Sequence, residues 1–408
     1  MITNIEVVNY RTCLRTKFAP HPQLSVLIGP NGSGKTNLLH AITILKQLST
    51  EARFGRGPQD VPTVSSRITV TFALAGTEVR LLADVKTFSD ENNRDVIIYS
   101  RQRWHLPGIT PPRRPLTIPL VAALYAHGSA RQQALFGHDF VYWSQRNAMA
   151  VQAIPREAWS LVRSVAEFLS QMQYYSASQF TNPARTAVSF EIEEGEGLPR
   201  RQRLSGHSAF LSDLYTQRNR ADSGYSQFLD IVGPKGLHLI DHIEFQEIPT
   251  SSINYSVQVG GKVVQQTRAK MLIVPQLTVG KQTLSPNQLS EGTFRTLALI
   301  FYLTTQPSTL ILLEEPEVCV HHGLLNSILG VVKVHSREKQ IILSSHSEFV
   351  LDHVAPENVF SVSFRQDRGT EVKGIASSLS RSALEALREY LRTEGNLGEY
   401  WRSGGLDE

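Results

Sequence analysis

Short runs in which apolar and polar residues alternate mark the first hundred residues of the chain. One such run is residues 5–10, and three more follow at residues 68–74, 79–85 and 95–100. Successive side chains of a strand point to opposite faces of a sheet, so this alternation predicts strands with one buried face. Turn residues separate the last three runs, and we therefore expect an antiparallel meander.

Three other runs, residues 24–28, 310–315 and 340–345, are largely apolar and are typical of strands buried on both faces. A segment with a helical pattern, residues 37–45, follows the first run. The second run ends in two carboxylates, and the third is followed directly by a histidine. A buried strand that ends in polar side chains predicts a functional edge of a parallel sheet, because ligands bind at the carboxyl ends of such strands.

The middle of the chain has a different pattern. Between residues 116 and 233 the helical period dominates, as in residues 159–172, and one strand-like run interrupts it at residues 187–192. Strand patterns return at residues 239–245, 255–259, 262–264 and 271–274, where Gly260-Gly261 predicts a tight hairpin. Near the C-terminus, residues 383–391 are amphipathic and predict a helix that covers its own core or docks on a partner.

Composition adds few restrictions. The chain has 408 residues, a formal charge of +4 and a pI near 9.0. This mild excess of basic residues is compatible with nucleic-acid contact but does not require it. Its two cysteines, Cys13 and Cys319, have no metal-ligand spacing and indicate a reducing compartment. Without a signal sequence or a long apolar window, we expect a cytoplasmic protein with no membrane partner.

The residues between the first buried strand and its helix match the phosphate-loop pattern G-x-x-x-x-G-K-[ST] in full. Glycines there let successive backbone N–H groups face one anion at the positive end of the helix. Lys35 is expected to reach the β- and γ-phosphates, and Thr36 to bind Mg²⁺. The pattern therefore predicts a nucleoside triphosphate and Mg²⁺ as cofactors. The predicted nucleotide ligands from this loop are Asn31, Gly32, Ser33, Gly34, Lys35 and Thr36.

The two carboxylates that end the second buried strand, Glu314 and Glu315, supply the matching half of such a site. We expect Glu314 to bind Mg²⁺ directly or through water, although aspartate is usual there. Glu315 is expected to orient and deprotonate the attacking water. His346, at the end of the third buried strand, is the predicted catalytic partner.

A resemblance to a family rests on the order of these motifs. Residues 289–292 read Leu-Ser-Glu-Gly, precede a helical run at residues 294–301, and lie about two dozen residues before the paired carboxylates. This arrangement resembles the signature of ABC-type ATPases. The resemblance implies that Ser290 and Gly292 bind the γ-phosphate of nucleotide held by the opposite subunit.

Two further segments are similar to the RecF-, OLD- and SMC-like group of these ATPases. Residues 315–321 resemble its E-P-E-x-x-L-H segment, with Val320 in place of leucine. His321 carries this likeness, while His322 stands where many relatives have proline. His346 resembles the switch histidine of the group, which senses the γ-phosphate and positions the water. Gln179 and Gln276 both remain candidates for the glutamine-bearing loop of the family.

The fold that this resemblance implies is an α/β P-loop NTPase of ABC type, with a mixed central sheet, an antiparallel subdomain and a mostly helical insertion. Four segments are predicted. Residues 1–110 hold the first part of the ATPase core, and residues 111–236 form the insertion. Residues 237–375 hold the signature, the paired carboxylates and the histidine, and residues 376–408 form a C-terminal helix and tail.

The resemblance further implies hydrolysis of ATP to ADP and phosphate in a homodimer or a higher homo-oligomer joined through the ATP sites. Two biological functions stay open. One is DNA-associated work, such as repair or anti-phage defence, with DNA as a partner. The other is a nucleotide-gated sensor or scaffold that controls a separately encoded effector such as a nuclease. Only about 60 residues follow His346, so we expect no TOPRIM nuclease domain, and a transporter ATPase is the weakest alternative.

Overall fold

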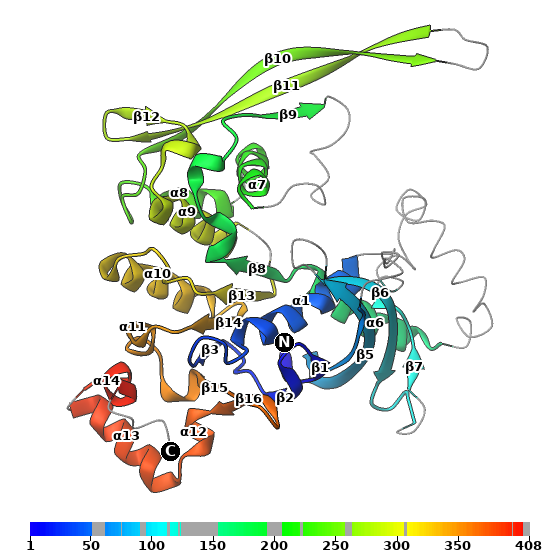
Figure 1. The fold of residues 1–408 in the computed structure, drawn as a ribbon, viewed down its shortest axis with the longest axis vertical. Coiled ribbons are helices and arrows are strands. Elements are labelled where there is room, and N and C mark those ends of the chain that lie inside the picture. The colour runs from blue at the N-terminus through cyan, green and yellow to red at the C-terminus, as the bar shows by residue number, and fades with distance from the viewer. Residues whose placement is uncertain are drawn as a thin grey trace. The chain divides into compact units, whose positions relative to one another are not determined.

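In the computed structural model, the chain divides into two compact units. The residues that it describes are 1–50, 62–74, 76–89, 95–111, 115–120, 123, 154–193, 206–220, 223–257, 263–305, 308–393 and 395–402. The first unit contains residues 1–174, 307–315 and 336–408, and the second contains residues 175–306 and 316–335. Each is described by itself below, and Figure 1 labels their elements.

An antiparallel sheet in the first unit has the order β2-β1-β4-β5-β6-β7. Buried and open positions alternate along these strands, as their sequences predict. The strands are β1 (Ile2–Tyr10), β2 (Cys13–Phe18), β4 (Val64–Leu74), β5 (Thr77–Ser89), β6 (Asp95–His105) and β7 (Leu116–Thr117). The expected meander is confirmed as β4, β5 and β6, which pair in sequence. Strand β2 was not among the strands that the alternation predicts, and it pairs with β1.

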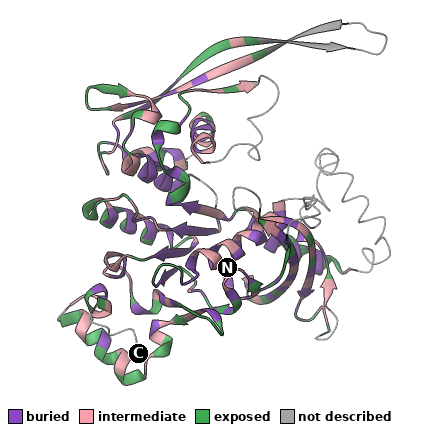
Figure 2. Cartoon of the chain, viewed as in Figure 1, coloured by how far each residue is buried: buried purple, intermediate pink, exposed green. Residues whose placement is uncertain are grey.

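A mixed central sheet has the order β16-β15-β3-β14-β13-β8. Its strands are β3 (Leu24–Ile28), β8 (Gln173–Ser176), β13 (Leu310–Glu314), β14 (Gln340–Ser345), β15 (Val359–Arg365) and β16 (Gly369–Gly374). Strands β3, β14 and β13 run parallel, and every residue in them is buried. Figure 2 shows these strands in the colour of buried residues. The three predicted buried strands are therefore confirmed, whereas the β15–β16 hairpin was not predicted.

Helices α1 (Lys35–Thr50) and α6 (Arg156–Ser170) share the main core of the first unit. Helix α6 buries Trp159, Val162 and Leu169 in this core. The remaining helices of the unit are α11 (Glu348–Leu351), α12 (Ile375–Ser378), α13 (Arg381–Thr393) and α14 (Leu397–Arg402), with one short 3₁₀ turn, η5 (Pro356–Asn358). The predicted C-terminal helix corresponds to α13, whose Leu387 is buried.

The second unit combines helices with a long twisted hairpin (Figure 1). Its strands are β9 (Phe190–Glu193), β10 (His242–Val257), β11 (Val263–Val279) and β12 (Gln282–Leu284). Its helices and 3₁₀ turns are η1 (Ala177–Phe180), η2 (Pro183–Arg185), α7 (His207–Arg220), α8 (Ser223–Val232), η4 (Pro286–Gln288), α9 (Glu291–Thr304) and α10 (His322–His335). Aromatic rings of Phe210, Phe228 and Phe301 pack edge to face between these helices.

Several predicted elements differ from the observed ones. The strand runs at residues 262–264 and 271–274 belong to one continuous strand, β11, which pairs with β10 along its length. The boundaries of the two units differ from those of the four predicted segments. One reason is that α6 packs on α1 of the first unit, although α6 lies within the predicted insertion at residues 111–236. The four segments stay a prediction. The turns predicted at residues 90–93 and at Gly260-Gly261 lie outside the described residues.

Candidate functional site

The phosphate loop connects the end of β3 to the first turn of α1 in the first unit. Lys35 is buried, and its ammonium group donates hydrogen bonds to the carbonyl oxygens of Gly29 at 2.8 Å and Pro30 at 3.1 Å. Gly34 has a φ of +101°, and a Cβ there would lie 2.0 Å from Oγ1 of Thr370. Only glycine fits this position, because the conformation and the close approach both exclude a side chain.

Glu314 ends β13 beside this loop. The register aligns Glu314 with Ser344 of β14, and Ser344 with Leu27 of β3, so the carboxyl ends of the three strands lie together. The Thr36 hydroxyl donates a hydrogen bond to Oε1 of Glu314, and the phenol of Tyr174 donates one to Oε2. Glu314 is buried, and its two carboxylate oxygens therefore have separate donors.

Glu315 and His346 lie side by side at the next position of the same edge. Nδ1 of His346 is 3.5 Å from Oε1 of Glu315, and their side chains are 45% and 36% exposed. The backbone N–H of Glu315 donates to the carbonyl oxygen of Ser344 at 3.0 Å. Glu315 has a φ of +47°, the left-handed region, so the chain turns sharply between the two carboxylates. Their side chains consequently face different neighbours.

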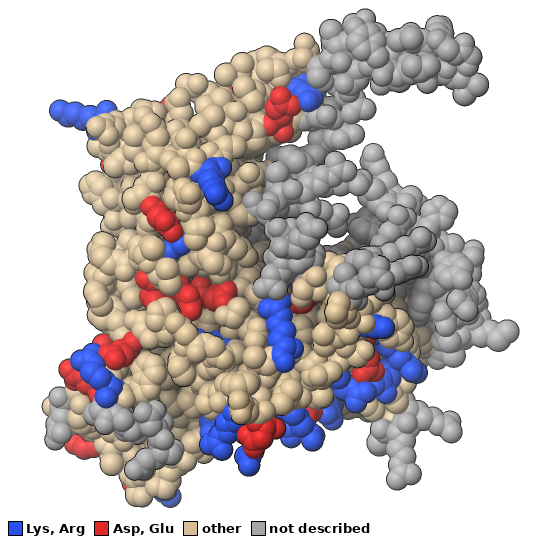
Figure 3. All heavy atoms as spheres, viewed as in Figure 1, with Lys and Arg blue, Asp and Glu red and all other residues tan. Residues whose placement is uncertain are grey.

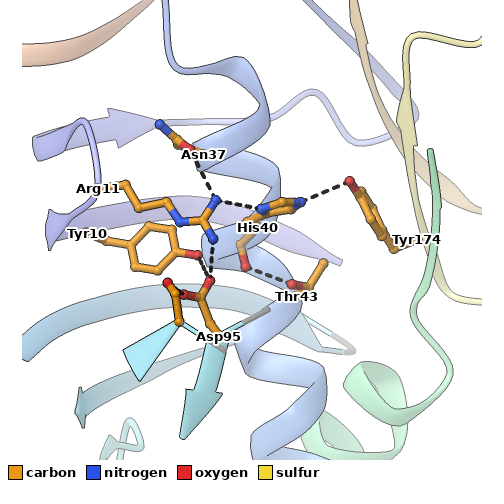
Figure 4. A network of polar contacts seen from close by, with 8 residues as sticks. Tyr10, Arg11, Asn37, His40, Thr43, Asp95 and Tyr174 are labelled. Carbon is orange, nitrogen blue, oxygen red and sulfur yellow. Dashed lines mark hydrogen bonds and ion pairs between the residues drawn. The ribbon is translucent and has the colours of Figure 1, made fainter. Parts of the chain in front are cut away.

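A polar network leads from the antiparallel sheet to Tyr174 (Figure 4), whose hydroxyl donates to Glu314. Nη1 of Arg11 lies 3.0 Å from Nδ1 of His40, and Nε2 of His40 lies 3.1 Å from the Tyr174 hydroxyl. Nη2 of Arg11 also pairs with Asp95 at 3.1 Å. Because guanidinium groups only donate, Nδ1 of His40 must accept and Nε2 carries the proton. Burial, reinforced by the Arg11 charge, lowers the pKa of His40 and favours this neutral form.

The predicted signature residues belong to the second unit. Ser290 is the N-cap of α9, and its exposed hydroxyl accepts a hydrogen bond from the backbone N–H of Thr293 at 3.1 Å. Gly292 lies in the first turn, where a Cβ would be 2.5 Å from the carbonyl oxygen of Cys319. Arg295, one turn further on, is buried and donates to the carbonyl oxygen of Val318 at 3.3 Å. The start of α9 is thus packed on the turn that follows the paired carboxylates.

The histidines of this turn have ordinary structural surroundings. Nδ1 of His321 accepts a hydrogen bond from the backbone N–H of Leu324 at 3.3 Å, which caps α10, and His322 is the first residue of that helix. Neither glutamine candidate for the family loop gains support. Gln179 is exposed in η1, and Gln276 lies inside β11, where it accepts a hydrogen bond from Gln246.

The first unit therefore brings together the phosphate loop, Glu314, Glu315 and His346, while Ser290 and Gly292 lie in the second unit. The Thr36 hydroxyl and the Glu314 carboxylate are hard oxygen donors, and this donor set fits Mg²⁺. Among the described residues, no group of three His, Cys, Asp or Glu side chains has metal-ligand geometry by itself. A cation here would need further ligands from nucleotide phosphates or water.

Sequence reasoning missed Arg11, His40 and Tyr174. His40 stands one helical turn after Thr36, and this spacing places both side chains on one face of α1. That spacing could have indicated His40. Tyr174 lies well over a hundred residues from both Thr36 and Glu314, and no local pattern connects these three residues.

The distribution of charge and the hydropathy of the helices do little to distinguish between the possible functions. On the face shown in Figure 3, the basic and acidic side chains of described residues are interspersed. None of the helices in the described part of the chain is long and apolar enough to cross a membrane.

Two families match the sequence. The family described as "AAA ATPase domain" matches residues 1–99. The family described as "AAA domain, putative AbiEii toxin, Type IV TA system" matches residues 174–352. The two matched ranges contain the phosphate loop and both carboxylates respectively, with Ser290 and His346 in the second.

Individual relatives share less with the chain. The DNA replication and repair protein RecF of Desulforamulus reducens is 42% identical over 41 residues, which are 10% of this chain and 11% of that protein. An SMC head bound to the C-winged helix domain of ScpA has a TM-score of 0.48 and 14% identity, covering 93% of this chain and 99% of that chain. The SMC head domain from Thermotoga maritima has a TM-score of 0.43 and 11% identity, covering 92% of this chain and 98% of that chain.

The family matches and the motifs agree in type and in order along the chain. The chain belongs to the AAA-family ATPases, two of whose families match residues 1–99 and 174–352.

Proposed function

We propose that this protein binds ATP at the phosphate loop and hydrolyses it to ADP and phosphate. One observation carries the proposal. Glu314 contacts Thr36 of the loop, while the adjacent Glu315 turns toward His346 and leaves its carboxylate partly exposed. A buried carboxylate for the cation and an accessible one for water are the two groups that phosphoryl transfer to water requires.

Each residue has a separate task in this reaction. Lys35 exchanges the carbonyl oxygens of Gly29 and Pro30 for phosphate oxygens. The backbone N–H groups at the start of α1 face the anion. Glu315 orients the attacking water and accepts its proton. His346, 3.5 Å from Glu315, positions that water against the γ-phosphate.

Thr36 and Glu314 would hold Mg²⁺, which supplies charge neutralisation for the β- and γ-phosphates when it is bound. The Thr36 hydroxyl donates a hydrogen bond to Glu314, so the lone pairs of the Thr36 oxygen stay available to a cation.

We also propose that two copies of the chain assemble through the nucleotide. Ser290 is exposed, and it caps its helix through Thr293 of the same turn. An exposed hydroxyl at a helix N-terminus can donate a hydrogen bond to a phosphate oxygen. A γ-phosphate held by the phosphate loop of another copy is the proposed ligand of Ser290 and Gly292.

Two biological roles follow, each supported by a different match. The RecF relative is named for DNA replication and repair, which supports DNA-associated work with nucleotide-dependent DNA affinity. The family that matches residues 174–352 is named for a toxin, which supports a nucleotide-gated sensor or scaffold that controls a separately encoded effector such as a nuclease. Salt-dependent DNA binding that appears only with ATP favours the first role.

The variant Glu315→Gln tests the reaction. It keeps the shape of the side chain and removes its basicity, so we expect ATP turnover to fall about 10²–10⁴-fold while ATP binding is retained. Single-turnover hydrolysis and equilibrium binding of a fluorescent ATP analogue measure the two quantities. Turnover within a factor of two of the wild type would exclude Glu315 as the base.

A further inference from the structure

We propose that Tyr174 determines which divalent cation the site accepts, by binding one oxygen of Glu314. This inference rests on the proposed function, because it takes Thr36 and Glu314 as the cation ligands. Tyr174 is a positioning residue here, since it contacts the carboxylate and not the reacting atoms.

The first step concerns the carboxylate. Thr36 donates to Oε1 of Glu314 and Tyr174 donates to Oε2, so different hydrogen bonds engage the two oxygens. Glu314 is buried, and a hydrogen bond to a buried ionised group is stronger than one between neutral groups. The phenol therefore holds Oε2 and leaves Oε1, beside Thr36, as the oxygen that faces the cation site.

The second step concerns the direction of that hydrogen bond. A phenol can donate or accept, so something must set its orientation. Nε2 of His40, 3.1 Å away, donates to the Tyr174 oxygen because Arg11 donates to Nδ1 of the same ring. Arg11 is in turn held by Asp95 and by the Asn37 side chain at 3.5 Å. Figure 4 shows the contacts that lead from Arg11 through His40 to the Tyr174 hydroxyl, and this hydroxyl donates to Glu314.

The third step concerns the cations. Mg²⁺ requires near-octahedral geometry at short distances and usually takes a carboxylate through one oxygen, whereas Ca²⁺ accepts more ligands and can bind a carboxylate through both oxygens. Glutamate is one methylene longer than the usual aspartate, and an unrestrained Glu314 could present both oxygens. By occupying Oε2, Tyr174 limits Glu314 to one oxygen and favours Mg²⁺ over Ca²⁺.

The variant Tyr174→Phe tests this inference with a binding measurement. It keeps the ring, which packs edge to face on His40 with centroids 5.6 Å apart, and removes only the hydroxyl. Mn²⁺ bound together with a non-hydrolysable ATP analogue is followed by its electron paramagnetic resonance signal, and Mg²⁺ or Ca²⁺ is titrated against it. We expect the variant to favour Ca²⁺ relative to Mg²⁺ by about tenfold more than the wild type, the lower end of the effect of outer-shell partners.

A matched control is Tyr10→Phe. Tyr10 lies in the same network, where its hydroxyl donates to Asp95 and not to Glu314. The Tyr10→Phe variant should leave the ratio of Ca²⁺ to Mg²⁺ affinities unchanged. His40→Leu should shift the ratio in the same direction as Tyr174→Phe but less, and His40→Gln should restore it because an amide can also donate to the phenol.

The outcomes separate the inference from the proposed function. If Tyr174→Phe changes the Mg²⁺ and Ca²⁺ affinities by the same factor, or changes neither, Tyr174 does not select the cation and the inference is wrong. If Thr36→Ala keeps nucleotide-dependent Mn²⁺ binding intact, the cation is not held at this site. That second result contradicts the proposed function itself.

Discussion

The two regions that carry the motifs of this protein are built in opposite ways. At the phosphate loop, Lys35 and Glu314 are buried. Lys35 donates to Gly29 and Pro30 of the loop, and Glu314 accepts from Thr36 of α1 and Tyr174 of β8. At the start of α9, Ser290 is exposed, and the hydrogen bonds that its hydroxyl makes go to Thr293 of the same turn.

This difference indicates where each region finds its partners. A group that several elements hold in place is organised before the ligand arrives, so less conformational entropy is lost when the ligand binds. A group that is held only by its own helix turn has a free face for an external ligand. The phosphate-loop region is therefore organised within its own unit, while the start of α9 presents an exposed hydroxyl, in agreement with the proposed binding of a phosphate that another chain carries.

The largest effect should come from damaging the phosphate-loop region. In Gly34→Ala the new methyl group would lie 2.0 Å from Oγ1 of Thr370, in a left-handed conformation. We expect the free energy of unfolding to fall by about 3 kcal/mol or more, with loss of ATP binding. Thermal unfolding and a nucleotide-binding assay measure both changes.

Gly32→Ala is the control for this variant. Gly32 also has a positive φ, +81°, but no atom lies within 4 Å of the added methyl group. The expected cost is about 1–2 kcal/mol, from the backbone conformation alone. Equal losses for the two variants would show that Thr370 does not restrict the loop.

At Ser290, the exposed residue at the start of α9, we expect a smaller loss of stability but a complete loss of assembly. Ser290→Asp keeps an N-cap oxygen on α9 and adds a negative charge that repels phosphate. In a Glu315→Gln background, ATP should double the mass in solution with Ser290 or Ser290→Thr, and should not do so with Ser290→Asp. Light scattering with and without ATP and Mg²⁺ measures the masses. Doubling in the aspartate variant would contradict a phosphate at Ser290.

The smallest effect concerns pH and the network behind Glu314. Burial and Arg11 lower the pKa of His40 below its ordinary value of 6.5, against weaker opposing effects of Glu314 and Asp95. The unfolded chain therefore takes up a proton before the folded chain does, and stability falls as pH drops through 6.5 toward the lowered pKa. His40→Gln removes this contribution, so it should lose less stability than the wild type between pH 7.5 and 5.5 in urea unfolding. A parallel loss in both proteins would place the pH dependence elsewhere.

Local patterns predicted much of the fold. The buried strands β3, β13 and β14, the meander and α1 all appear where apolar periodicity placed them. Apolar periodicity gave wrong strand bounds where pairing with a neighbouring strand decides how far a strand extends. Residues 263–279 contain several polar residues and a proline, and they form one strand because β10 lies beside them over its full length. The β15–β16 hairpin buries the first residues of each strand and exposes the last residues of β15, so little regular hydrophobic periodicity marks it.

The sequence by itself determined the identity of the chemical groups at the candidate site. The phosphate loop, the carboxylate pair and His346 are contiguous motifs, and each has a function that its own residue types explain. Tertiary structure alone decided which side chains surround them. Arg11, His40, Tyr174 and Glu314 come from four distant parts of the chain, and only the packing of α1, β8 and β13 brings them within hydrogen-bond distance. A hydrogen bond depends on position and direction in space, and residue order along the chain specifies neither.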